Sequence, residues 1–150
     1  MKLEPEWVVG FVDGEGCFHV GIATHAEMTL GYQILPEFTV VQHKRDEQIL
    51  NALKAFFGCG VVRNNHDDRL AYRVRGFDHL TTIIVPFFIK HSLKTKKNLN
   101  FKKFCRVLQL MKKGRHLTKE GLEEIRGIAN QMNIKAMKAD ACEAALDQEL

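Results

Sequence analysis

Acidic residues are missing from a long stretch of this sequence. No aspartate or glutamate occurs between His79 and Lys119, whereas eleven of the 22 lysines and arginines lie there. A segment with charge of one sign repels itself unless it meets a polyanion, so DNA or RNA is the default partner. A solvated basic face is the alternative interpretation, because the net charge of +4 and the pI near 8.9 are only mildly basic.

Paired cysteines and long apolar runs are also missing. The four cysteines, Cys17, Cys59, Cys105 and Cys142, are scattered and form no CxxC pair, which predicts reduced, mostly buried thiols and argues against a zinc site. No apolar run reaches the roughly 18–20 residues of a membrane span, and no basic-then-apolar leader opens the chain. Together with 45% hydrophobic and 27% charged residues, these absences indicate one globular domain without membrane association.

The apolar segment 5–16, PEWVVGFVDGEG, has the spacing of a short helix. Gly10 and Gly14 are four residues apart and leave a groove without side chains. Because interior glycine costs about 1 kcal/mol relative to alanine, the groove indicates close approach of another helix. Asp13 and Glu15 lie at the negative C-terminal end of the helix dipole, where a cation would be stabilising, so this end indicates a metal site.

The rest of the chain alternates between the periodicity of strands and that of helices. Pro36 indicates an edge position or a bulge in its strand, because proline cannot donate to the ladder. Gly58 is predicted to end one helix and Thr118 to cap another, and Asp78 is predicted to cap a helix that ends around Pro86. The predicted strands are 17–24, 32–42, 60–65 and 70–75, with NNHDD as the last turn, and the predicted helices are 44–57, 78–86, 98–111 and 118–132.

This order predicts an α+β domain in which a four-stranded antiparallel sheet carries helices on one face. Strand alternation places amides, hydroxyls, histidine and arginine on the other face, and such groups can read base edges in a major groove. A plain solvent-exposed face is the alternative, but three converging arginines favour nucleic acid. The candidate DNA-binding residues are His19, Gly21, Ala23, Gln33, Leu35, Glu37, Thr39, Arg63, Asn65, Arg73 and Arg75 on the strands, with Lys96 further along the chain.

The segment 8–16, VVGFVDGEG, resembles the signature of the LAGLIDADG homing endonucleases. Gly10, Asp13 and Gly16 match the signature, and Glu15 replaces its usual second aspartate. The resemblance covers most of the chain and implies an αββαββα core whose saddle-shaped sheet lies over DNA. The segment 1–133 is therefore interpreted as the endonuclease domain and 134–150 as a C-terminal tail or docked helix.

Only one copy of the motif is present, so the resemblance implies a homodimer that acts on a pseudo-palindromic site. In this dimer Gly10, Gly14 and Asp13 lie at the interface, where the glycines cross their copies in the partner. Asp13 is interpreted as a structural residue that bonds near the helix ends and does not hold metal.

The resemblance also implies the roles of individual site residues. Glu15 matches the metal-binding carboxylate, and the carbonyl of Gly14 matches a second ligand. Gln42 matches a polar residue that orders water near the scissile phosphate. Lys94 matches the basic residue that neutralises charge near the nucleophile, with Lys96 as its reserve. The implied cofactor is Mg²⁺, for which Mn²⁺ can substitute, because oxygen ligands and retained waters suit this ion.

The predicted function is a site-specific endonuclease that hydrolyses both strands of a long DNA target in intron homing. A maturase that helps its intron RNA fold, or a DNA-binding protein that kept the fold, is the alternative. A purely structural dimer would leave the acid-free basic segment unexplained. The resemblance further implies an intron-encoded protein of a chloroplast or mitochondrion.

Overall fold

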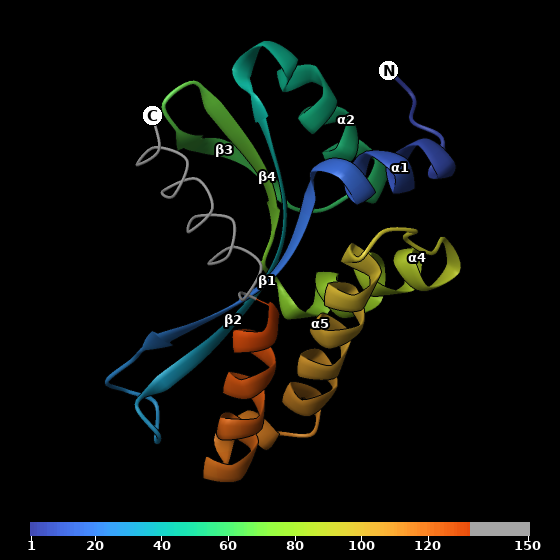
Figure 1. Ribbon diagram of the computed structural model, residues 1–150. Helices are drawn as coiled ribbons and strands as arrows, with labels where there is room; N and C mark the ends of the chain where they lie inside the picture. Colours follow the sequence, from blue (N-terminus) through green and yellow to red (C-terminus); the bar gives the residue numbers. More distant parts are fainter. Residues whose placement is uncertain (133–150) are drawn as a thin grey trace, which may run out of the picture.

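The computed structural model describes residues 1–132, in which a four-stranded antiparallel sheet of order β1-β2-β4-β3 is covered by helices on one side (Figure 1). The β1–β2 hairpin and the shorter β3–β4 hairpin extend from the centre in opposite directions (Figure 1). The α+β prediction is therefore confirmed. The helices are α1 (Pro5–Glu15), α2 (Glu47–Phe57), α3 (Phe77–His79), α4 (Val85–Lys90), α5 (Lys97–Lys112) and the segment 119–132; the strands are β1 (Gly16–Thr24), β2 (Tyr32–His43), β3 (Val61–His66) and β4 (Arg69–Val74).

Aromatic side chains fill the space between the sheet and the helices. Phe18 of β1 and Phe38 of β2 contact Phe88 of α4, with ring centroids 5.5 Å and 5.6 Å apart. Phe101 and Phe104 of α5 lie 5.2 Å and 5.4 Å from Phe18. All five rings are buried. Because buried aromatic rings dominate core energetics, this cluster holds α4 and α5 against the sheet.

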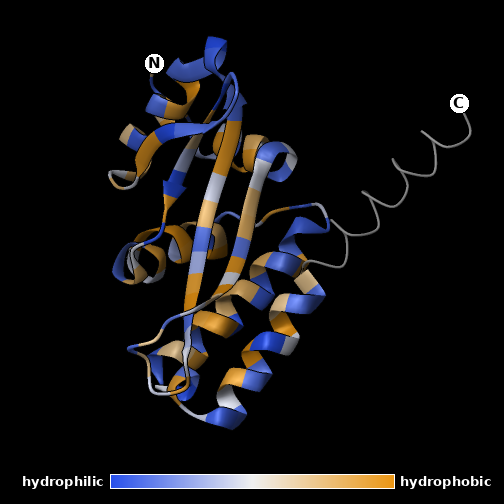
Figure 2. Ribbon diagram, turned by 90° about the vertical axis from the view of Figure 1, so that its left-hand side faces the viewer, coloured by the Kyte–Doolittle hydropathy of each residue, from blue (hydrophilic) through white to orange (hydrophobic). Residues whose placement is uncertain are grey.

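Strand alternation produces the two faces of the sheet as predicted. Ile34, Phe38 and Val40 of β2 are buried against the helices, whereas Gln33 and Leu35 are exposed on the opposite side. Figure 2 is turned toward the side without helices and shows hydrophilic and hydrophobic residues alternating along the long strands. We call this side, formed by the outward residues of β1–β4, the open face.

Pro36 occupies an edge position, which confirms the prediction for this residue. It faces Val20 of β1 in an uninterrupted register, but β4 pairs with β2 only from Phe38 onward. The second edge of β2 is therefore unpaired at Pro36, where a missing N–H removes no ladder hydrogen bond.

The helix predicted at 78–86 has both boundaries wrong. It begins at Phe77 without a cap from the Asp78 side chain, and it continues through a π-helical turn at Leu80–Ile84 to Lys90. Pro86 lies directly after the π-helical turn. Proline ends a regular α-helix because its ring clashes with the carbonyl one turn earlier, and the wider π-helical turn relieves this clash.

The turn between β3 and β4 is shorter than the predicted NNHDD. Residues 64–66 belong to β3, so that only Asp67 and Asp68 form the turn. Asp67 has a φ of 47°, a left-handed conformation that aspartate tolerates better than most residues. The pairing register shifts between Asn64 and His66, so Asn65 lies in a β-bulge.

Both helix-end predictions are confirmed. Gly58 follows α2 in the left-handed conformation, with a φ of 71°, and its N–H donates to the Lys54 carbonyl. The hydroxyl of Thr118 accepts a hydrogen bond of 3.1 Å from the N–H of Gly121, as a helix cap requires. The prediction for 134–150 lies outside the described residues. Within residues 1–132, no helix is long and apolar enough to cross a membrane.

The cysteines are less buried than predicted. Cys59 is buried and Cys105 half-buried, but Cys17 is exposed, and all three are free thiols. Cys17 lies on the open face because its neighbours in β1, Gly16 and Phe18, are buried on the helix-covered side and alternation turns Cys17 the other way. Cys142 lies outside the described residues. Among those described, no three His, Cys, Asp or Glu side chains are grouped to hold a metal ion.

Candidate active site and nucleic-acid interface

The C-terminal end of α1 runs directly into β1, and this junction brings two predicted site residues together. Glu15, the last residue of α1, is exposed. Its Oε2 accepts a hydrogen bond of 3.0 Å from Nε2 of Gln42, which lies near the end of β2. Gly16 permits the abrupt change of direction, because a Cβ there would lie 2.6 Å from the Val12 side chain and 3.0 Å from its carbonyl oxygen.

Asp13 connects this junction to the turn before α5. Its carboxylate accepts hydrogen bonds from the N–H of Lys94 at 2.7 Å, the N–H of Thr95 at 3.2 Å and the Thr95 hydroxyl at 2.7 Å. Partial burial by itself raises the pKa of Asp13, but these hydrogen bonds outweigh it and lower the pKa overall. Asp13 therefore bonds within the chain near the helix ends, as predicted, and fixes the backbone of Lys94 beside α1.

Lys97 is a residue of this junction that the sequence interpretation missed. Its ammonium donates to the carbonyl oxygens of Val12 at 3.0 Å and Asp13 at 3.1 Å, in the last turn of α1. A cation at this position offsets the partial negative charge of the helix end. The cation inferred from the misplaced acidic residues is therefore supplied in part by a lysine. Lys97 belongs to the lysine-rich run 92–98, SLKTKKN, and periodicity does not show which lysine of this run reaches α1.

Gly10 and Gly14, two of the three predicted interface residues, are exposed on α1, whereas Asp13 is half-buried against the turn before α5. A Cβ added at Gly10 or Gly14 would meet nothing within 4 Å in this chain, so the fold of one chain requires glycine at neither position. Beside Gly10, the rings of Trp7 and Phe11 stack with centroids 4.9 Å apart, and Trp7 is 44% exposed. We call Trp7, Gly10, Phe11 and Gly14 the α1 strip, an apolar surface with no side chain over its two glycines.

The structure gathers the predicted strand residues on the open face. The exception among the DNA-binding candidates is Lys96, which precedes α5 and lies near the α1 junction. Across β1 and β2 the outward pairs are His19 with Glu37, Gly21 with Leu35 and Ala23 with Gln33; across β2 and β4 Thr39 pairs with Arg73, and across β3 and β4 Arg63 pairs with Ala71.

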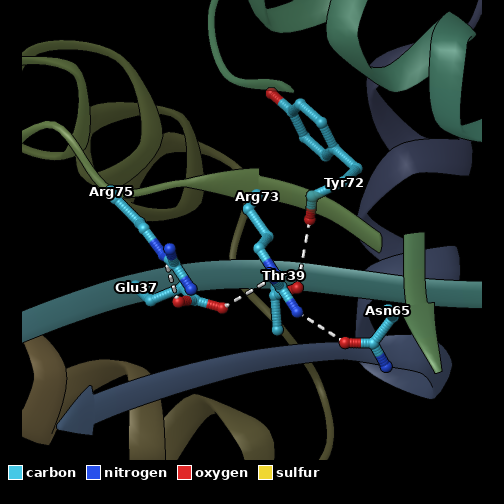
Figure 3. Close-up of polar contacts among 6 residues, drawn as sticks. All are labelled: Glu37, Thr39, Asn65, Tyr72, Arg73 and Arg75. Atoms are coloured by element: carbon cyan, nitrogen blue, oxygen red, sulfur yellow. Dashed lines mark hydrogen bonds and ion pairs between the residues drawn. The ribbon is translucent and has the colours of Figure 1, made fainter. Parts of the chain in front are cut away.

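Charged residues of the open face bond to one another (Figure 3). Nε of Arg75 donates to Oε2 of Glu37 at 2.7 Å, and Nε of Arg73 lies 3.6 Å from Oε1 of the same carboxylate. Nη2 of Arg73 also donates to Oδ1 of Asn65. Strand alternation places these residues on one face but does not predict which of them pair. Their pairing depends on the bulge at Asn65 and on the position of Arg75, which directly follows the last residue of β4.

The acid-free segment 79–119 mostly lies away from the open face. It forms α4, α5 and the turn after them, on the side of the sheet that the helices cover (Figure 1). Its portion Lys94–Lys97 reaches the α1 junction. The positive charge of the open face comes instead from the arginines of β3 and β4 and from Arg75, which follows β4.

The model of the LAGLIDADG endonuclease family matches residues 8–108, which include α1, the whole sheet and most of α5. The chain belongs to the LAGLIDADG endonuclease family. The resemblance of the segment 8–16 to the family signature is thereby confirmed, and the fold just described is that of the solved family members.

Two solved family members show how much of the chain is shared. The crystal structure of the homing endonuclease I-TnaI superposes with a TM-score of 0.87 at 57% identity, over 95% of this chain and 99% of that chain. I-SmaMI, bound to an uncleaved DNA target in the presence of calcium ions, superposes with a TM-score of 0.84 at 31% identity, over 87% of this chain and 45% of that chain.

A curated relative links the family to introns. The chain is 30% identical to a probable intron-encoded endonuclease of Neurospora crassa, over 82% of this chain but only 28% of the relative. The chain thus spans about a quarter of the length of the first curated relatives it matches.

Endonucleases of this family depend on divalent metal ions, which agrees with the calcium ions present in the I-SmaMI complex. In this chain the candidate ligands are the Glu15 carboxylate and the Gly14 carbonyl, an oxygen-only set that suits hard cations. Of these two candidate ligands, only Glu15 contributes a side chain, and its Oε2 also accepts the hydrogen bond from Gln42.

Proposed function

We propose that this chain is a site-specific homing endonuclease that cuts both strands of a long, pseudo-palindromic DNA target as a homodimer with Mg²⁺. Mn²⁺ is expected to substitute. The observation that carries the proposal is the α1 junction, where an exposed Glu15 carboxylate is held by Gln42 in a chain of an endonuclease family. Because the relatives include intron-encoded proteins, we further propose that the chain is intron-encoded in a chloroplast or mitochondrion.

Each residue of the junction has a role in phosphodiester hydrolysis. Glu15 and the Gly14 carbonyl would hold the metal, which when bound polarises a phosphate oxygen and lowers the pKa of a bound water. The amide N–H of Gln42 orients the Glu15 carboxylate, and its amide oxygen is an acceptor for a water O–H. Lys94 lies in the turn that is bonded to Asp13, and its ammonium supplies positive charge that offsets the negative charge of the phosphate.

The homodimer is supported by the α1 strip. Interior glycine costs a helix about 1 kcal/mol relative to alanine, and no neighbour within this chain requires it at Gly10 or Gly14. Close packing of the same helix from a second chain accounts for both glycines. It also brings a second Glu15 to the junction, as a two-fold interface requires. The chain matches less than half of I-SmaMI, consistent with one chain supplying half of an active unit.

The test is incubation of the protein with a duplex that carries its intron-insertion sequence, first with Mg²⁺ and then with Ca²⁺. We expect double-strand cleavage with Mg²⁺ and binding without cleavage with Ca²⁺, while a duplex of scrambled sequence stays uncut. Absence of cleavage with Mg²⁺, combined with tight binding of the intron RNA, would replace the nuclease with the maturase alternative.

A further inference from the structure

A carboxylate lies in the middle of the face that we propose to meet DNA. Glu37 pairs with His19 across β1 and β2, and its side chain is 17% exposed between Arg73 and Arg75 (Figure 3). An acid pointing at the phosphates would weaken binding, because like charges repel and the phosphate backbone dominates affinity. The position of Glu37 therefore calls for a physical account other than a phosphate contact.

One oxygen of Glu37 accepts a hydrogen bond from an arginine, and the other forms a longer ion pair with a second arginine. Oε2 accepts the hydrogen bond from Nε of Arg75 at 2.7 Å, and Oε1 lies 3.6 Å from Nε of Arg73. An acid that reads a base directly accepts a hydrogen bond from the cytosine amino group, which needs an available acceptor oxygen. Oε2 is occupied and Glu37 is only 17% exposed, whereas Arg75 is 64% exposed, so this part of the face presents the arginine and not the acid to DNA.

The two arginines are held to different degrees. Arg75 is bonded through Nε while its side chain stays 64% exposed, so its Nη1 and Nη2 groups are not needed for the contact with Glu37 and are accessible for a bidentate contact. Arg73 is only 24% exposed; its Nη2 donates to Asn65, while its Nε lies 3.6 Å from Glu37 and makes no hydrogen bond. Bidentate donation to O6 and N7 of guanine is the commonest specific contact that arginine makes in a major groove.

From this arrangement we infer that Glu37 is a positioning residue that sets base specificity. It holds the Arg75 guanidinium, including Nη1 and Nη2, in one orientation. This inference rests on the proposed DNA-binding function. An arginine held before binding loses less side-chain freedom when it meets a base. An arginine released from Glu37 can instead turn to any nearby phosphate, which adds affinity without sequence information.

The matched test compares Glu37→Gln with Glu124→Gln. Each substitution removes one acid from an arginine pair, but Glu124 bonds Arg106 at 3.1 Å on the helix-covered side. Both variants and the unaltered protein are used, with Ca²⁺, to select bound duplexes from a pool of random sequence, and their affinity for one non-selected duplex is measured against salt. For Glu37→Gln we expect base preference to fall about tenfold at one or two positions of each half-site.

The salt dependence of binding gives a second readout. Removal of a merely structural residue would not tighten binding to the non-selected duplex or steepen its salt slope. Glu37→Gln is expected to bind the non-selected duplex more tightly, with a salt slope steeper by about one, because one more phosphate is neutralised. Glu124→Gln is expected to leave both the selected motif and the slope unchanged. Equal slopes for the unaltered protein and Glu37→Gln would overturn the inference.

A double-mutant cycle shows whether Glu37 acts through Arg75. Arg75→Gln, at an exposed position, should lose preference at the same base pairs, and adding Glu37→Gln to it should cause no further loss. Additive losses, or loss of preference for a single cytosine with Glu37→Gln alone, would identify Glu37 as a base reader and overturn the inference. If the unaltered protein selects no motif from the pool, the proposed function itself fails.

Discussion

The two faces of the sheet are organised by different interactions. On the helix-covered face, Phe18, Phe38 and Phe88 are buried in an aromatic cluster whose arrangement follows from shape and apolar area. On the open face, Glu37 and Arg75 are arranged by charge and hydrogen bonding, with Arg75 largely exposed. We expect this difference to separate stability from the proposed recognition of DNA: burial on the helix-covered face stabilises the sheet, whereas exposed side chains of the open face, such as Arg75, should contribute little to the folding free energy.

The largest expected effect on stability tests this separation. Phe88→Ala should lower the free energy of unfolding by about 3–5 kcal/mol, because it removes a buried ring at the centre of the aromatic cluster. Leu35→Ala, on the open face where Leu35 is 44% exposed, should change it by no more than about 0.5 kcal/mol. Denaturant titration measures both, and similar losses would contradict the separation.

Lys94→Ala removes a positive charge at the α1 junction, which belongs to neither face of the sheet. Cleavage is expected to slow by about 10²–10³-fold, as on removal of a charge-stabilising group, with little change in DNA affinity. The backbone N–H of Lys94 still bonds Asp13 in this variant, so the turn is retained. Single-turnover cleavage and binding measured on the same duplex separate the two effects; a pure loss of affinity would recast Lys94 as a phosphate contact.

Lys97→Met should destabilise the junction. It removes two charge-assisted hydrogen bonds to the last turn of α1, and such bonds are worth about 1.5–3 kcal/mol each at most. A loss of about 1–3 kcal/mol in unfolding free energy is therefore expected, together with slower cleavage. The control is Lys102→Met, an exposed position of α5, for which we expect a change within about 0.5 kcal/mol.

Gly10→Ala is expected to stabilise the single chain slightly and to weaken its self-association. Alanine should stabilise the single chain by up to about 1 kcal/mol, because a Cβ fits there without contact, yet it should weaken self-association in sedimentation experiments. Gly127→Ala, in the helix 119–132 and equally open, should stabilise the chain without changing association. Unaltered association of Gly10→Ala would remove the α1 strip from the interface.

Much of the fold could be predicted because hydrophobic periodicity reports directly on burial. The alternation in β2 placed Phe38 and Thr39 on opposite faces, and Thr118 and Gly58 marked helix ends through local hydrogen bonding. The helix around Pro86 was predicted wrongly because a π-helical turn depends on the surrounding structure and has no simple local pattern.

The candidate site was predicted in part by resemblance and in part not at all. Glu15 was named from the family signature and Gln42 from its match to a family position at the end of the second strand, and the structure brings the two side chains within 3.0 Å. Lys97 was missed because the sequence does not show which of several neighbouring lysine side chains points toward α1. Tertiary contacts decide this direction. The pairing of Glu37 with Arg75 joins residues from different strands, and no periodicity within one strand contains it.

We propose that the end of α1 carries the reaction, and Glu15→Gln tests this role. Binding and cleavage of the intron-insertion duplex are measured with Mg²⁺ for Glu15→Gln and for Glu6→Gln, which alters an exposed acid at the other end of the same helix. We expect Glu15→Gln to bind normally and to cut at least about 10³-fold more slowly, while Glu6→Gln cuts normally. Cleavage by Glu15→Gln at the rate of the unaltered protein would contradict the account.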